Sequence, residues 1–390
     1  MLEQISFLRI LLSLVLIGVV IVIRRLYWHP LSKFPGPALP ALTSFYQFYI
    51  FWTHEEGNCH PVYMAEPYIQ VLWYFSFDVI TAMSMGTPVG FMDAKDDVRG
   101  LIRNMEETAV RRRLFVSSPN DRRGLGLFMA EIRQEVQQRS ACATEPKYEH
   151  SMLDQWLASS SSNGQGIPQQ EIEDELLMDI HTRLTDSVSR MAGPDSIALM
   201  ATNLIFLVAD RRPILQRAQA EVDAAYADGR LSGQVPTYDE CRQLPFITAC
   251  VNEGLRFVAS TFPRRRASPP GRPFSLNGIH VPPGTSVSSS AAMIGRHPDL
   301  YGDQADEFLP DRWLAASPEQ LQEWARLDVH WGVGVRKCLG KHVGLMALYK
   351  TLVALVRSFD LQLEETTTIN RWSYPSSENM LLTLRMPSAQ

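Results

Sequence analysis

Cysteine is scarce in this 390-residue chain, and its five cysteines form no recognisable pattern. They stand far apart, at Cys59, Cys142, Cys241, Cys250 and Cys338. An odd number of scattered cysteines without a Cys-x-x-Cys pair excludes a disulfide-rich secreted scaffold, and it offers no zinc-finger spacing. This cysteine usage is typical of a reducing compartment such as the cytosol.

The sequence also lacks a cluster of basic residues. Its 37 lysines and arginines are outnumbered by 42 aspartates and glutamates, which gives a formal net charge of −5. No region accumulates enough positive charge to follow a phosphate backbone, so we expect no nucleic-acid partner. No internal repeat is visible. With 45% hydrophobic and 20% charged residues, the composition predicts a folded globular body.

Hydrophobic runs long enough to cross a bilayer are absent except at the N-terminus. Residues 5–23 are apolar with three interruptions, which is about the length that a membrane-spanning helix needs. Arg24 and Arg25 follow, where a signal peptide would carry a small-residue cleavage site. We therefore expect an uncleaved transmembrane anchor at residues 1–25; a buried amphipathic helix is the alternative.

The residues that flank this segment predict its orientation and the layout of the chain. Arg24 and Arg25 favour a lumenal N-terminus and a cytosolic remainder under the positive-inside tendency. Residues 26–45 are rich in proline and indicate a semi-rigid linker. Residues 46–390 then form the expected folded body.

Apolar periodicity predicts that this body is mostly helical. Helices are expected over residues 66–80, 101–115, 126–138, from 171 onward, and over 213–227, 244–258 and 343–359. Residues 197–209 are apolar on nearly every side, and at this length such a run indicates a helix in a protein core. Short strands are expected at 278–281 and 285–289, and the serine run 159–164 is expected to be a flexible surface loop. The predicted fold class is mainly α with a small β portion (α+β).

Two charged residues share one face of the helix predicted at 244–258. Glu253 and Arg256 are spaced so that a carboxylate and a guanidinium can pair. Taken alone, such a pair is more often an exposed decoration of a helix. A second arginine, Arg312, follows in the irregular, proline-containing segment 308–313, which on its own indicates an ordinary loop.

The stretch 331–340 carries one cysteine among spaced glycines. Its notable residues are Trp331, Gly332, Gly334, Arg336, Cys338 and Gly340. The glycines permit a tight turn that leaves the Cys338 sulfur facing outward beside the start of a helix. A helix N-terminus and nearby cations stabilise a thiolate over a thiol. A buried structural cysteine and a zinc ligand are the alternatives.

These three elements, in this order and with these separations, resemble the cytochrome P450 family of haem-thiolate enzymes, and specifically its fungal membrane-bound members. The resemblance implies that Cys338 is the axial ligand of the iron of haem b (iron protoporphyrin IX). It also implies that Glu253, Arg256 and Arg312 form a buried ionic cluster that fixes the loop beneath the haem.

Other residues acquire roles through the same resemblance. Arg336 and Arg264 match family positions whose guanidinium groups bind haem propionates. Gly332, Gly334 and Gly340 match the family's haem-binding loop, and Trp331 stands where the family usually has phenylalanine, which keeps an aromatic ring at this position.

The segment Ala192-Gly193-Pro194-Asp195-Ser196 resembles the family's distal-helix motif. The resemblance implies that Asp195 and Ser196 deliver protons opposite the thiolate. Read alone, the pentapeptide indicates a helix cap, with Asp195 or Ser196 supplying a side-chain oxygen. Pro194 within the motif is expected to remove a helical hydrogen bond and to kink the chain.

The resemblance also implies a function. We expect a monooxygenase that inserts one oxygen atom of O2 into a small hydrophobic substrate, in secondary-metabolite biosynthesis, with electrons from NADPH through a separate reductase. The expected location is the endoplasmic reticulum membrane, with a single pass and a cytosolic catalytic domain. The resemblance places four cations near the thiolate side of the haem, where they would dock an acidic electron donor: Arg336, Lys337, Lys341 and His342. A solvated face explains these cations equally well.

The sequence departs from the family in one large respect. None of the eight tryptophans is followed four residues later by arginine, so the family's Trp-x-x-x-Arg helix is missing. About a hundred residues are absent near 46–67, judged against the family's usual length. These departures support the alternative of a truncated, catalytically inactive family member that binds haem weakly or not at all.

Overall fold

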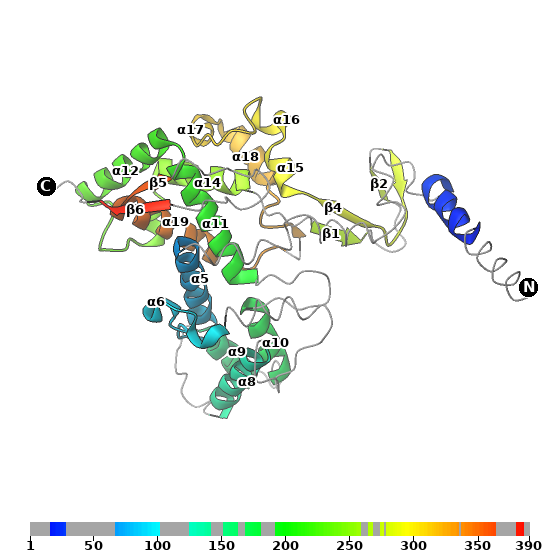
Figure 1. Ribbon diagram of the computed structural model, residues 1–390, viewed down its shortest axis with the longest axis horizontal. Coiled ribbons are helices and arrows are strands. Elements are labelled where there is room, and N and C mark those ends of the chain that lie inside the picture. Colours follow the sequence, from blue (N-terminus) through cyan, green and yellow to red (C-terminus); the bar gives the residue numbers. More distant parts are fainter. Residues whose placement is uncertain are drawn as a thin grey trace, which may run out of the picture. The chain divides into compact units, whose positions relative to one another are not determined.

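The computed structural model describes about two thirds of the chain (Figure 1). The described residues are 16–28, 67–101, 125–141, 151–162, 168–180, 192–258, 264–267, 274–276, 278–334, 337–363 and 380–385. The chain divides into two compact units, one of residues 1–61 with 261–290 and one of residues 62–260 with 291–390.

The first unit contains two small antiparallel sheets. Strands β1 (Arg264–Ala267) and β4 (Ser286–Ser289) pair with each other, and β2 (Phe274–Leu276) pairs with β3 (Ile279–Val281). Gly278, at the turn between β2 and β3, has a φ of 78°, which glycine adopts without strain. The strands expected at 278–281 and 285–289 correspond to β3 and β4; β1 and β2 have no counterpart among the predictions.

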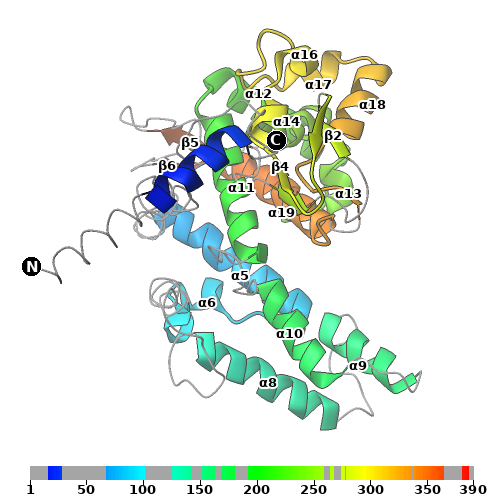
Figure 2. The same cartoon turned by 90° about the vertical axis from the view of Figure 1, so that its right-hand side faces the viewer.

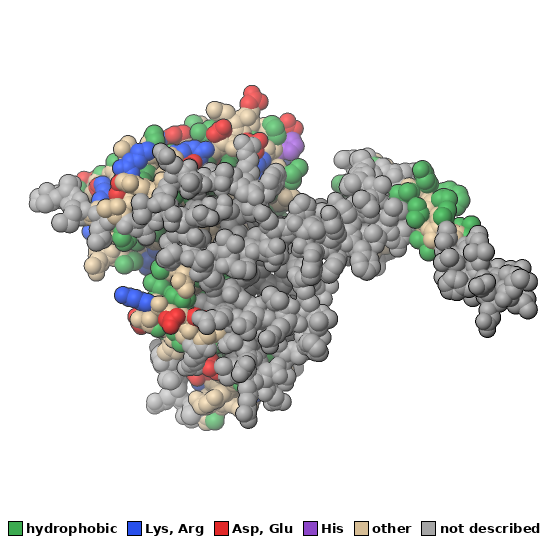
Figure 3. Space-filling model, in the orientation of Figure 1, with side chains coloured by type: hydrophobic (Ala, Val, Ile, Leu, Met, Phe, Trp, Pro, Cys, Tyr) green, Lys and Arg blue, Asp and Glu red, His purple; other side chains and the backbone are tan. Residues whose placement is uncertain are grey.

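The N-terminal segment is described from residue 16 onward. Residues 16–23 are helical and continue into a π-helical turn, η1 (Arg24–Trp28). Figure 3 shows hydrophobic side chains on the surface of this segment. Leu16, Val20 and Ile23 are exposed. No helix in the described part of the chain is long and apolar enough to cross a membrane. Most of the expected anchor lies outside the described residues, so the anchor and the domain boundaries at 25 and 45 stay predictions.

The second unit is mainly helical. Its longer helices are α5 (Pro67–Met85), α8 (Leu125–Ala141), α9 (Met152–Ser162), α10 (Gln169–Ile180), α11 (Ala192–Ala209), α12 (Arg212–Ala227), α14 (Pro245–Val258), α18 (Pro318–Leu327) and α19 (Lys341–Ser358). The shorter ones are α6 (Phe91–Ala94), η4 (Val98–Gly100), α13 (Tyr238–Cys241), α15 (Ala291–Gly295), α16 (Pro298–Tyr301) and α17 (Asp311–Ala315). Strands β5 (Phe359–Leu363) and β6 (Met380–Leu384) form one antiparallel ribbon. The predicted class, mainly α with a small β portion, is confirmed.

Helix α11 forms the core of this unit. It packs against α5, α14 and α19 (Figure 1), while α8, α9 and α10 pack together (Figure 2). Residues 201–209 of α11 are all buried, because the helix is apolar on every side and neighbouring helices cover it. Each large apolar side chain buried there, such as Leu204 or Phe206, contributes about 1.5–3 kcal/mol.

The partly buried carboxylate of Asp78 fixes the turn that follows α5. Asp78 accepts hydrogen bonds from three successive backbone N–H groups, those of Gly90, Phe91 and Met92, at 2.8–3.1 Å. These N–H groups are free at the start of α6, so the carboxylate satisfies donors that have no partner within the helix. The Phe91 ring then packs on Phe77 and closes this part of the core.

Every predicted helix that lies within the described residues corresponds to an observed one, whereas α6, α9, α13 and α15 to α18 were not predicted. Those expected at 66–80, 126–138, 197–209, 213–227, 244–258 and 343–359 correspond to α5, α8, α11, α12, α14 and α19, and α10 begins at Gln169 near the expected onset at 171. The expected helix at 101–115 falls outside the described residues beyond Leu101. The loop prediction for the serine run is wrong for residues 159–162, which form the last turn of α9. Serine costs only a moderate free energy in a helix relative to alanine. The buried packing of Leu153 and its neighbours stabilises α9, so the helix continues into the serine run.

Candidate functional site

A buried ion pair lies on α14 in the second unit. Glu253 and Arg256 stand on one face of α14, and their side chains are 0% and 1% exposed. Arg256 Nε and Nη2 donate to the two carboxylate oxygens of Glu253, each at 2.8 Å. This two-point contact is the strong form of an arginine–carboxylate pair. The exposed-decoration alternative therefore does not apply to this pair.

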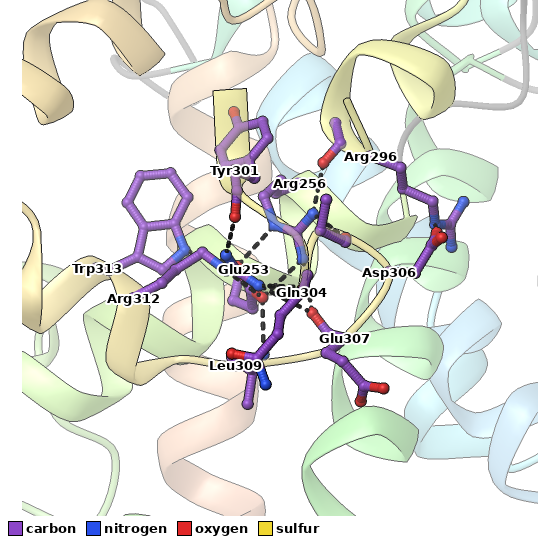
Figure 4. Close-up of polar contacts among 12 residues, drawn as sticks. Glu253, Arg256, Arg296, Tyr301, Gln304, Asp306, Glu307, Leu309, Arg312 and Trp313 are labelled. Carbon is purple, nitrogen blue, oxygen red and sulfur yellow. Dashed lines mark hydrogen bonds and ion pairs between the residues drawn. The ribbon is translucent and has the colours of Figure 1, made fainter. Parts of the chain in front are cut away.

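Arg312 joins the pair from α17. Its Nε donates to Glu253 Oε1 at 3.0 Å, and the backbone N–H of Leu309 donates to the same oxygen at 2.7 Å. Arg312 also donates to the carbonyl oxygens of Tyr301 and Gln304. The irregular conformation expected for residues 308–313 is wrong at 311–313, because these residues begin α17. Glu253 holds this segment to α14 (Figure 4).

Arg256 extends the network to the main chain. Its guanidinium donates to the carbonyl oxygens of Gly295, Ala305 and Glu307. Residues 295–313 are therefore tied to one helix by two arginines and one carboxylate (Figure 4). We call Glu253, Arg256 and Arg312, with the residues that they contact, the ionic cluster.

Trp313 is a member of the ionic cluster to which the sequence analysis gave no role. Its indole Nε1 donates to Glu253 Oε2 at 2.8 Å, so Glu253 accepts from four residues. Its ring packs edge-on against Trp324, at 4.9 Å between centroids. A tryptophan directly after Arg312 was the available signal, since a partly buried indole N–H usually has an acceptor.

The cysteine loop ends at the start of α19. Cys338 is exposed, and its backbone N–H donates to Trp331 O at 2.6 Å, which closes the loop. Gly332 and Gly334 have φ values of 74° and 68°, which a residue with a side chain adopts only with strain. Gly340 stands directly before α19 without a side-chain cap. The sulfur is therefore presented outward next to a helix N-terminus, and the buried-cysteine alternative does not describe it.

An aspartate and a histidine brace the start of the loop. Asp328 Oδ1 accepts from the backbone N–H of His330 at 2.9 Å and lies 2.6 Å from His330 Nδ1. Burial acts to raise the pKa of Asp328, but hydrogen bonds from His330 and the charges of His330 and Lys341 outweigh it and lower that pKa. The carboxylate therefore stays ionised at neutral pH.

The distal-motif residues lie in the first turns of α11. Pro194 lies within the first described turn of α11, and the kink expected there stays a prediction. Ser196 donates to the carbonyl oxygen of Gly193 at 3.1 Å. Both Asp195 and Ser196 lie inside the helix, so neither occupies the cap position of the alternative interpretation. The side chain of Asp195 lies outside the described residues.

Two predicted haem contacts also lie outside the described part. Arg336 is not described, and Arg264 is described only by its backbone, which pairs with Ser289 in the β1–β4 sheet. Their predicted contacts with the propionates stay predictions.

The described residues around Cys338 fit a haem. A porphyrin is a flat apolar ring that needs one axial donor with apolar surface beside it. Val333 and Leu339, on either side of Cys338 in the chain, are 55% and 85% exposed. A thiolate is a soft donor suited to haem iron. Among the described residues, no group of three or more His, Cys, Asp or Glu side chains could hold a bare metal ion.

The body is mainly helical, an exposed cysteine directly precedes the helix α19, and α14 carries a buried Glu–Arg–Arg cluster. This combination is the arrangement of a haem-thiolate protein. The sequence profile described as Cytochrome P450 matches residues 69–385. The chain belongs to the cytochrome P450 family, and the expected oxidoreductase class is confirmed.

Curated relatives and solved structures agree with this assignment. The chain is 30% identical over 335 residues to the cytochrome P450 monooxygenase ustC of Aspergillus flavus, covering 84% of this chain and 77% of that protein. It is 29% identical over 316 residues to gsfF of Penicillium aethiopicum, covering 75% of this chain and 60% of gsfF. The crystal structure of the cytochrome P450DA heme domain has a TM-score of 0.63 at 18% identity, over 81% of this chain and 66% of that one. This structural likeness shows the fold alone.

Proposed function

We propose that the protein is a haem-thiolate monooxygenase with Cys338 as the axial ligand. The observation that carries this proposal is the exposed Cys338 at the end of a glycine-shaped loop, directly before α19. Haem b, when bound, supplies an iron centre that activates O2, and a thiolate ligand favours cleavage of the O–O bond.

The residues of the chain would hold and orient the haem. Cys338 provides the sulfur, and the exposed side chains of Val333 and Leu339 provide apolar contact beside it. The ionic cluster keeps residues 295–313 fixed on α14, which limits movement in the segment that leads to the cysteine loop. On α11, Ser196 holds a hydroxyl against Gly193 O, and we assign Asp195 and Ser196 to proton delivery.

The proposal extends to partners by analogy with relatives. The relatives ustC and gsfF are named as monooxygenases, and we propose a small hydrophobic organic substrate, O2 as oxidant, and a role in secondary-metabolite biosynthesis. We propose that electrons come from NADPH through a reductase that docks where Lys337 and His342 are exposed and Lys341 is partly exposed. We also propose location at the endoplasmic reticulum membrane, through the apolar N-terminal segment.

The test is the carbon monoxide difference spectrum of the reduced full-length chain, expressed in membranes with added hemin. We expect a strongly red-shifted Soret band from thiolate-ligated haem. Cys338→Ala should abolish this band, because no other described cysteine is exposed: Cys241 and Cys250 are buried. Cys250→Ala is the matched control and should keep the band. Absence of the band in the unaltered chain would favour the truncated, inactive alternative.

A further inference from the structure

A glycine in the first turns of α19 faces the side chain of Trp331. Gly344 is buried, and a Cβ atom built on it would lie 3.1 Å from Trp331 Cη2 and 3.3 Å from Cζ3. Contacts this short require the neighbouring group to move by a few tenths of an ångström. The absence of a side chain at position 344 thus leaves room for the six-membered part of the indole.

The backbone of the same tryptophan is hydrogen-bonded to Cys338, the proposed iron ligand. The carbonyl oxygen of Trp331 accepts the backbone N–H of Cys338 at 2.6 Å. The Nζ atom of Lys341, in the first turn of α19, lies 5.9 Å from the indole centroid of Trp331, within cation–π range. Trp331 therefore contacts Cys338 through its backbone and α19 through its ring.

Glycine at position 344 is unfavourable for the helix itself. A glycine inside a helix is less stable than alanine, because the unfolded backbone loses more conformational freedom. Gly344 has a φ in the helical range, so its backbone does not require glycine. The contact with Trp331 is the feature of the described surroundings that alanine would disturb.

We infer that Trp331 and Gly344 form a matched pair, in which the space at Gly344 seats the indole and thereby sets the position of Cys338 at the N-terminus of α19. Trp331 is therefore a positioning residue, and the missing side chain of Gly344 leaves the space that its ring occupies. The inference rests on the proposed function for the role of Cys338 as iron ligand. The geometry that it uses involves only the cysteine loop and α19.

The test is a double-mutant cycle on the full-length chain with added hemin. Gly344→Ala should reduce the thiolate-type carbon monoxide band about twofold or more, the low end of coupling between residues in contact. Trp331→Phe removes the atoms that meet the new methyl group, so the double variant should recover most of the band lost in Gly344→Ala. Met346→Ala, at an exposed position on the same helix, is the matched control and should leave the band unchanged.

A second readout separates this inference from the proposed function. The rate at which a thiol reagent modifies Cys338 is measured in the purified chain without added hemin, with the Cys338→Ala chain as background. Gly344→Ala should change this rate, and the double variant should restore it. If the unaltered chain gives no thiolate-type band, the proposed function fails while this rate still tests the pair. The inference would be overturned if Gly344→Ala changed neither the carbon monoxide band nor the rate of Cys338 modification. It would also be overturned if Gly344→Ala reduced the band and Trp331→Phe did not restore it.

Discussion

The side chains of Glu253 and Arg312 lie 3.0 Å apart, although 59 residues separate them in the chain. Glu253 is completely buried, and Arg312 is nearly so. A buried carboxylate is costly unless donors surround it, and here Arg256, Leu309 and Trp313 complete its shell. The contact therefore joins α17 to α14, in addition to the ion pair between Asp311 of α17 and Arg217 of α12.

Neutralising this carboxylate should destabilise the fold strongly. Glu253→Gln leaves two buried guanidinium groups without their counter-charge, and removal of one partner of a buried pair costs about 3–5 kcal/mol. We expect a loss of this size in the free energy of unfolding, measured with urea. Glu307→Gln is the control: this side chain is 58% exposed and 3.6 Å from Arg211, so the change should cost about 0.5 kcal/mol or less. Equal losses for the two variants would show that the cluster is not a stabilising unit.

Two tryptophans allow the indole hydrogen bond to be tested separately. Trp313 Nε1 donates to the charged Glu253, whereas Trp324 Nε1 donates to the neutral carbonyl of Leu300 at 2.9 Å. Substitution by phenylalanine removes the indole N–H at both positions, and it removes the same amount of ring from the side chain. Because hydrogen bonds to charged groups are stronger, Trp313→Phe should lower the free energy of unfolding by about 1 kcal/mol more than Trp324→Phe. The reverse order in urea unfolding would contradict the assignment of Trp313 to the ionic cluster.

The sequence predicted the helices well where apolar periodicity is strong. Helices α11, α14 and α19 have long apolar faces, and their predicted bounds lie within a few residues of those observed. The pairing of β5 with β6 was not predicted, because the partners of a strand lie far along the chain and leave no local signal.

The sequence predicted which residues belong to the candidate site, but it did not predict the contacts between their side chains. Glu253, Arg256, Arg312 and Cys338 follow from motifs, because spacing and order are properties of the sequence. The seat that Gly344 gives to the Trp331 ring is a property of packing, since a glycine in a helix looks the same in the sequence whatever faces it.

Close backbone approach predicts a difference between two helical glycines. A Cβ atom at Gly295 would lie 2.4 Å from the carbonyl oxygen of Arg256, which is backbone and cannot rotate away. At Gly254 the nearest atom, at 2.7 Å, is Leu204 Cδ1, the end of a flexible side chain. Gly295→Ala should therefore cost about 3 kcal/mol or more, whereas Gly254→Ala should stay within about 1 kcal/mol, because alanine favours a helix. Urea unfolding of both variants checks this, and similar costs would contradict it.

Alkaline pH should destabilise the chain through a buried thiol. Burial raises the pKa of Cys241 from its ordinary value of 9.0 to about 11. The unfolded chain therefore loses this proton at a lower pH than the folded chain, and the unfolded state binds fewer protons between these values. Stability from this group is complete below about pH 9, the ordinary pKa, and is lost as the pH rises through the folded pKa of about 11.

Cys241→Ala should remove this part of the pH dependence. Between pH 8 and pH 10 we expect the free energy of unfolding of the unaltered chain to fall by about 1 kcal/mol more than that of the variant. Burial also raises the pKa of Tyr226 above its ordinary value of 10.0, so the comparison stops at pH 10. Leu244→Ala, at a buried position nearby, is the control: it should lower stability equally at both pH values, since leucine does not titrate. Parallel pH profiles for the unaltered chain and Cys241→Ala would show that this thiol ionises equally easily in both states.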